Sequence, residues 1–171
     1  MARLPTVGSD NGNWGDVLNE YLQVEHNTDG THKTDYLPKS GGTMTGNINV
    51  ADNVVSQAEI KDYAETVVTA NSGATYTVNL ANGNVYELTL TASCTLTFSN
   101  PPASGKAGSV TLILIQDGTG NRTITWPASV KWSNASAPTL TTTANAVDII
   151  QLLTTNGGTT WRGFLAGKNL S

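Results

Sequence analysis

The amino-acid sequence predicts a mainly β protein, in which a helical arm and a narrow neck precede a β-rich head. From Thr75 onward, short runs rich in β-branched residues alternate with Gly, Asn and Pro clusters, a pattern typical of an antiparallel β-sandwich, here jelly-roll-like. Before that point, two segments carry apolar residues at helical spacing. We predict three parts: an N-terminal arm with a short helix (residues 1–35), a neck with a short strand and a short helix (residues 36–72), and a C-terminal β-sandwich (residues 73–171).

The first helix is predicted to follow Asn13, a suitable N-cap residue. Its apolar residues recur at i, i+3, i+4, i+7 and i+8 and are Trp14, Val17, Leu18, Tyr21 and Leu22. The neighbouring segments contain few apolar residues that could cover a Trp and a Tyr. We therefore expect this stripe to dock on another subunit or on a larger particle, with packing on its own chain as the alternative.

The neck is predicted from two short segments. Residues 36–50 read YLPKSGGTMTGNINV, in which three small residues precede a Thr- and Ile-containing run suited to a short strand. Ser56 and Glu59 form a capping box in front of a second apolar stripe, which predicts a helix over residues 56–70. Neither segment is long enough to be stable alone, so three identical chains are expected to meet here. The residues expected at this contact are Met44, Ile48, Ile60, Tyr63 and Val67. The alternative is a helix that lies on its own β-domain.

The β-domain is predicted to contain seven strands, near residues 75–80, 85–91, 94–98, 109–116, 122–126, 146–154 and 159–166. The strands at 109–116 and 146–154 are apolar on both faces, as expected for the centre of a sheet. The core should be built on these two strands.

Charge and composition exclude several classes of function. Residues 1–65 contain four basic and ten acidic residues, a net charge of −6, whereas the remainder contains five basic and three acidic residues. No basic stripe is present, which argues against nucleic-acid binding. No secretory signal and no membrane-spanning run is visible, so the sequence predicts a soluble product of the cytosol. Cys94, the only cysteine, is expected to be a small apolar residue of a strand.

No catalytic, cofactor or metal site is predicted. The β-domain offers only three carboxylates for glycoside hydrolysis: Glu87 on a strand face, Asp117 in a Gly-rich turn and Asp148 in an apolar strand. His26 and His32 flank the sequence NTDG, which predicts a turn. Metal binding by these histidines on a threefold axis is the less favoured interpretation.

The aromatic residues of the β-domain are the candidate ligand-binding residues. Trp126 and Trp132 bracket a Pro-containing bend, and each could stack on a sugar ring or fill the core. The nearby loops, residues 117–121, 133–138 and 156–159, are polar and nearly uncharged, which suits hydroxyl-rich ligands. We therefore add Asn121 and Asn134 to the candidate site.

Two stretches resemble a known family. The sequence LPKSGGTMTGNI is similar to an element that recurs in tail fibres of tailed bacteriophages and related contractile particles, and residues 4–33 resemble the attachment segment of small tail and baseplate fibres. The resemblance implies a homotrimeric virion protein whose N-terminal segment attaches to the tail or baseplate and whose distal domain binds the host surface, with a glycan or polysaccharide as the expected receptor. A capsid-attached decoration fibre is the alternative, and a polysaccharide depolymerase is a weaker one.

Overall fold

The computed structural model describes residues 12–25, 46, 48, 50 and 54–170. The chain divides into two compact units, Met1–Ala58 and Glu59–Ser171, which we describe separately. The first contains one described helix, and the second contains the β-domain. Most of the predicted neck strand, including Met44, lies outside the described residues, as do His26 and His32.

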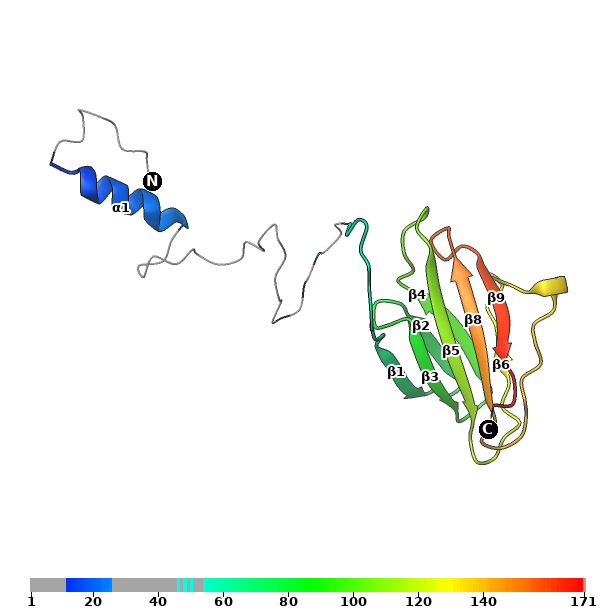
Figure 1. The fold of residues 1–171 in the computed structure, drawn as a ribbon. Helices are drawn as coiled ribbons and strands as arrows, with labels where there is room; N and C mark the ends of the chain where they lie inside the picture. Colours follow the sequence, from blue (N-terminus) through cyan, green and yellow to red (C-terminus); the bar gives the residue numbers. More distant parts are fainter. Residues whose placement is uncertain (1–11, 26–45, 47, 49, 51–53, 171) are drawn as a thin grey trace. The chain divides into compact units, whose positions relative to one another are not determined.

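The helix α1 spans Trp14–Glu25, as the apolar spacing predicts (Figure 1). The Val17 N–H donates to the Asn13 carbonyl at 3.0 Å, which is the first helical hydrogen bond and agrees with Asn13 as the N-cap residue. Trp14 is 48 % exposed, whereas Val17 and Leu18 are half-buried. The Tyr21 side chain lies outside the described part of the chain.

The prediction of a helix over residues 56–70 is wrong. Residues 54–66 are exposed and form no helix, and Val67–Asn71 is the strand β1. Gln57 and Asp62 have positive φ angles of 55° and 56°, which a right-handed helix does not allow. The β-branched residues at the end of this segment instead pair with β3 (Val85–Leu90), so a tertiary partner overrides the helical spacing.

The β-domain consists of two sheets (Figure 1). The larger has the order β1, β3, β5 (Gly108–Gln116), β8 (Val147–Thr154), β9 (Trp161–Gly167) and β7 (Val130–Lys131). The smaller has the order β2 (Thr75–Asn79), β4 (Cys94–Ser99) and β6 (Ile124–Thr125). β5 and β8 occupy the centre of the larger sheet, which confirms the prediction from their apolar composition.

The mainly β fold class is confirmed, but the antiparallel jelly-roll pairing holds only for β5, β8 and β9. From β1 to β6 the chain passes alternately between the two sheets, so that β1, β3 and β5 pair in parallel in one sheet and β2, β4 and β6 in the other. Consecutive strands therefore face each other across the core instead of forming hairpins. Each return to the same sheet repeats the earlier strand direction, which makes the neighbours parallel.

The core lies between the two sheets. β3, β5 and β8 alternate buried and half-buried residues, so each strand turns one face inward. The inward residues Leu88, Leu112 and Ile150 belong to one buried cluster with Val78 and Leu96 of the smaller sheet. Cys94 is 2 % exposed and belongs to this cluster, as predicted, and burial raises the pKa of its thiol.

One hydrogen-bonded residue links the two sheets. Tyr86 of β3 donates its hydroxyl proton to the Asn79 carbonyl and accepts from the Asn79 N–H, at the end of β2. The Tyr76 and Tyr86 rings meet edge to face, with centroids 6.3 Å apart. Desolvation raises the pKa of both phenols.

Candidate binding site

Trp126 and Trp132 lie together, as the candidate site requires. Their ring centroids are 5.0 Å apart and their planes form an angle of 69°, an edge-to-face pair. Both residues are partly buried and pack against the core cluster. The benzene ring of Trp132 covers Gly163 of β9 so closely that a Cβ atom there would be 2.4 Å from Cζ3. These tryptophans therefore have a structural role as well as a partly accessible surface.

A small pocket adjoins Trp126. It has a volume of about 190 Å³, and its lining includes Arg122, Ile124, Pro138 and Leu140. Its position follows from the short strand β6, which ends beside Trp126, and from the long segment that precedes β8. Apolar side chains dominate the interior, and Arg122 is the charged residue of the lining.

The loop at residues 117–121 is held by Asp117. Its carboxylate accepts from the Thr119 and Gly120 N–H groups, and it also accepts from Arg122 through Nε at 3.0 Å and Nη2 at 2.8 Å. The Arg122 hydrogen bonds, aided by the two N–H groups, lower the pKa of Asp117. The charge of Arg122 is therefore matched within the loop.

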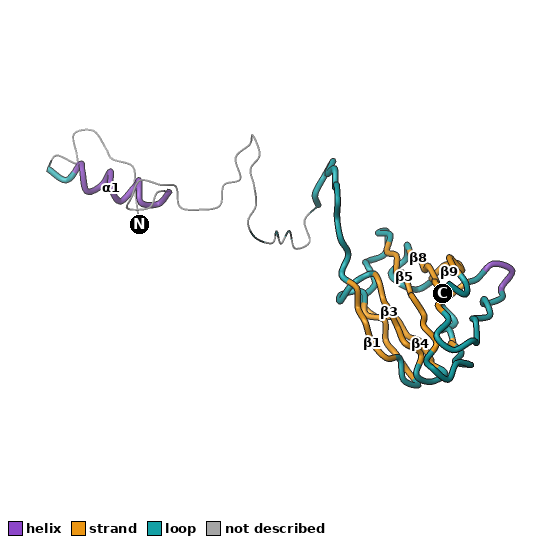
Figure 2. The backbone as a smooth tube through the Cα atoms, turned by 60° about the horizontal axis from the view of Figure 1, so that its bottom comes forward, coloured by secondary structure: helices purple, strands orange, loops and turns teal. Residues whose placement is uncertain are grey.

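Asn121 and Asn134 present exposed side chains from strained backbone positions. Their φ angles are 61° and 54°, a region that Asn tolerates better than most residues. Asn134 belongs to the 3₁₀ turn η1 (Ser133–Ala135), shown in purple at one end of the β-domain in Figure 2. Asn134 follows Trp132 by two residues, whereas Asn121 is not among the residues that line the pocket beside Trp126.

A larger pocket lies at a different place, which the sequence interpretation missed. Its volume is about 470 Å³, within the range of small-molecule sites, and no charged residue lines it. β4 contributes Phe98, β9 contributes Trp161, and the connecting loops contribute Pro101, Pro127 and Gly158. The Phe98 and Trp161 rings lie 4.9 Å apart with an angle of 31° between their planes. Two signals in the sequence pointed to it: Trp161, an aromatic residue of the last predicted strand, and the polar loop at residues 156–159.

The three carboxylates of the β-domain have different surroundings. Asp148 is 2 % exposed and faces inward, where it accepts hydrogen bonds from the Thr141 N–H and hydroxyl and from the Asn169 N–H. Glu87 lies on the opposite, half-buried face of the same sheet. The structural hydrogen bonds expected of Asp148 are thus present, and Asp117 is bonded to Arg122.

Among the residues that the structure describes, no group of three or more His, Cys, Asp and Glu side chains could hold a metal ion. In the same residues, no helix has the length and apolarity needed to cross a bilayer.

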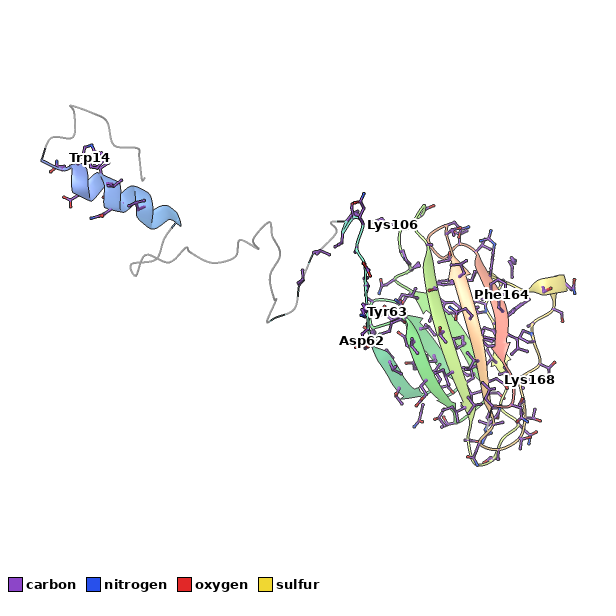
Figure 3. All side chains as sticks on the ribbon, viewed as in Figure 1. Trp14, Asp62, Tyr63, Lys106, Phe164 and Lys168 are labelled. Carbon is purple, nitrogen blue, oxygen red and sulfur yellow. The ribbon has the colours of Figure 1, made fainter. Side chains whose placement is uncertain are left out.

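The residues expected at the neck contact are exposed where the structure describes them. Ile60 and Tyr63 are 70 % and 69 % exposed in the extended stretch before β1, and Val67 of β1 is 52 % exposed. Figure 3 labels Tyr63 in this stretch. Ile48 is 65 % exposed in the first unit. Large apolar side chains are also exposed on β9, where Phe164 is 55 % exposed.

Comparison with known proteins gave one match. A family model described as "Putative phage tail fibre C-terminal domain" matches residues 68–160, just over half of the chain. The matched region begins in β1 and ends just before β9, so it covers the whole smaller sheet and the larger sheet except for β9 and the first residue of β1. No curated protein and no solved structure matches the chain.

Proposed function

The chain belongs to the phage tail fibre C-terminal domain family, and from this premise we propose that it attaches to the phage tail or baseplate and binds a glycan on the host surface. Its role is that of a structural protein of the virion tail. The observation that carries the proposal is the family match over the β-domain, the part that holds the two aromatic-lined pockets and the polar loops.

Binding through the β-domain is supported by its polar, nearly uncharged loops. Asn134 follows Trp132 by two residues and has an exposed side chain, so its amide can hydrogen-bond to hydroxyl groups while an aromatic edge of the Trp126 and Trp132 pair contacts an apolar sugar face. A single shallow site of this kind binds at about millimolar strength. Several linked copies raise the effective concentration and give durable attachment.

The experiment measures adsorption of the purified full chain to host cells, with variants that change side chains but not the backbone. Asn134→Gly and Asn121→Gly remove the amide groups while glycine tolerates the positive φ angles. Asn145→Gly, with a φ of 62° and an exposed side chain, is the matched control. We expect the first two variants to adsorb less than the control at equal thermal stability. Failure of the unaltered protein to adsorb would overturn the proposed function.

Trp132 needs a separate test because it also packs on β9. Trp132→Ala should lower stability by about 2–4 kcal/mol, as truncation of a packed aromatic residue does. Trp132→Phe retains much of the packing, and it should reduce adsorption while it melts close to the unaltered protein. Adsorption that is unchanged in a stable Trp132→Phe protein would remove this residue from the site.

Attachment to the particle is proposed to use α1. Trp14 and Leu22 are large exposed apolar residues of this helix, and a few such anchors supply most of the binding energy of an interface. Particles assembled with a protein that lacks residues 1–33 should not carry the fibre. Trp14→Ala should reduce the copy number, whereas Asn19→Ala, an exposed polar control on the same helix, should not. A normal copy number with the deletion would refute this assignment.

The proposed assembly is a homotrimer. Its support is the exposure of Ile60, Tyr63 and Val67, a strip of large apolar side chains that one chain leaves uncovered. Light scattering after size exclusion should give about three times the chain mass of 17.9 kDa. Ile60→Lys combined with Tyr63→Lys should produce monomers, and Thr66→Lys at a nearby exposed position should not. A monomer of the unaltered protein at micromolar concentration would rule out the trimer.

A further inference from the structure

We infer that the pocket between Phe98 and Trp161 binds one ring of a neutral carbohydrate, with the Trp161 indole N–H as a donor to the ligand. The inference rests on the proposed function, and it adds a second glycan-binding pocket, separate from the Trp126 and Trp132 pair. Its support is the unpaired indole group, the glycine beside it and the chemical character of the lining.

The Trp161 side chain is buried but leaves one polar atom unsatisfied. Trp161 is 1 % exposed, and no hydrogen bond from its Nε1–H exists within the described part of the chain. Every fully enclosed side-chain nitrogen or oxygen atom among the described residues has a partner. Nε1 is therefore not fully enclosed. Trp161 lines the pocket, and a ligand in the pocket is what would reach this atom. A buried indole usually finds an acceptor, so this N–H is positioned to donate to a ligand.

Gly158 keeps the indole N–H accessible. A Cβ atom at this position would lie 3.5 Å from Nε1 and 2.8 Å from Cγ of Pro101. Gly158 also has a φ of 76°, which L side chains rarely adopt. A larger residue in place of Gly158 would therefore obstruct the approach of a ligand to the Nε1–H of Trp161. The Gly157–Gly158 turn thus both shapes the wall and leaves room for a ligand atom near Nε1.

The rest of the lining matches a ring with several hydroxyl groups. Phe98 is half-buried, and its ring offers an apolar surface for the C–H face of a sugar. Asn100 donates its amide N–H to Asn79 at 2.8 Å, which leaves its carbonyl oxygen as an acceptor. The Ser99 and Ser129 hydroxyls have no partner among the described residues and can donate or accept.

This set of groups favours a neutral sugar over the other ligands that aromatic pockets bind. No charged residue lines the pocket, so an ionic ligand would lose its hydration without a counter-charge. A proline-rich peptide offers carbonyl acceptors for Trp161, but prolines have no N–H to give to the Asn100 oxygen. Sugar hydroxyl groups both donate and accept, and they satisfy both residues.

The test is titration of the ¹⁵N-labelled full chain, followed by the indole N–H resonances of its four tryptophans. Trp161→Phe identifies the resonance of Trp161. The probes are methyl α-D-glucopyranoside, methyl β-D-galactopyranoside and N-acetyl-D-glucosamine, each to about 50 mM because single sites of this kind bind weakly. At least one of them should shift the Trp161 resonance in a saturable manner while the Trp14 resonance stays in place.

Two variants then test the geometry. Gly158→Ala should weaken binding about tenfold, because the methyl group obstructs the donor. Gly73→Ala is the control, since Gly73 also has a positive φ but a Cβ atom there meets nothing within 4 Å. Phe98→Leu keeps an apolar residue but removes the stacking surface, and it should weaken binding about fivefold. Phe98→Leu also tests the pocket if the Gly158→Ala protein does not fold.

The outcomes separate this inference from the proposed function. If the chain adsorbs to host cells but no probe moves the Trp161 resonance, and Phe98→Leu adsorbs normally, the pocket assignment is wrong and the function stands. If a proline-rich peptide shifts the Trp161 resonance and the sugars do not, the ligand class is wrong. If the chain neither adsorbs nor binds any sugar, both are overturned.

Discussion

Asp148→Ala is expected to be among the most destabilising single changes in the β-domain. The carboxylate is 2 % exposed and accepts three hydrogen bonds, from the Thr141 N–H at 2.6 Å, the Thr141 hydroxyl at 2.9 Å and the Asn169 N–H at 2.8 Å. It therefore ties β8 to the segment before it and to the C-terminal end of the chain. Removal of the acceptor leaves these donors without a partner in a largely enclosed region.

The magnitude follows from the number of donors. Each donor that is buried without a partner costs about 1–3 kcal/mol, and water reaching the Asn169 end recovers part of this. We expect a loss of about 3–5 kcal/mol in the free energy of unfolding. Asp148→Asn retains one oxygen acceptor and should lose about half as much. Glu87→Ala, on the opposite face of the same sheet, should change stability by about 0.5 kcal/mol or less.

The assay is urea unfolding at pH 7, followed by tryptophan fluorescence at one fixed protein concentration, because oligomerisation makes apparent stability depend on concentration. The midpoint should fall in the order Glu87→Ala, Asp148→Asn, Asp148→Ala at a constant slope. If Asp148→Ala unfolds within about 0.5 kcal/mol of Glu87→Ala, the view that Asp148 organises this end of the domain is refuted.

Three further changes test other parts of the fold. Tyr86→Phe removes both hydrogen bonds between the sheets and should cost about 1–2 kcal/mol in urea unfolding; an unchanged midpoint would mean that the link is energetically neutral. Gly163→Ala should displace the ring of Trp132, lower stability by about 1–3 kcal/mol and alter tryptophan emission, and normal emission would contradict the close contact. Asp117→Asn tests the effect of Arg122, which lowers the pKa of the Asp117 carboxyl group in the folded protein. The ionised carboxylate stabilises the fold above the pKa of the unfolded chain, and this stabilisation is lost as the pH falls through the lower pKa of the folded protein. The variant should therefore have a lower free energy of unfolding than the unaltered protein at pH 7, and this difference should disappear in acid. A difference that stays constant with pH would exclude the ion pair as its cause.

Local signals in the sequence were sufficient where a segment's own residues decide its structure. α1 follows from apolar residues that recur with helical spacing after Asn13. β5 and β8 follow from apolar residues on both faces, a pattern that only a central strand can bury. The burial of Cys94 and the hydrogen bonds of Asp148 follow from their apolar strands, because a polar group there needs partners nearby.

Tertiary structure decided the features that depend on partners distant in the chain. Residues 67–70 fit both helical and extended spacing, and pairing with β3 determined the strand. The chain passes alternately between two sheets, and this produces the parallel ladders. The periodicity of a single strand does not reveal which sheet the strand joins. The larger pocket joins Phe98, Pro127 and Trp161 from separate elements, so no local motif marks it. The sequence by itself specifies which residues are apolar and favour burial. The three-dimensional arrangement specifies which of these residues contact one another, because all segments of the chain compete for pairing and packing.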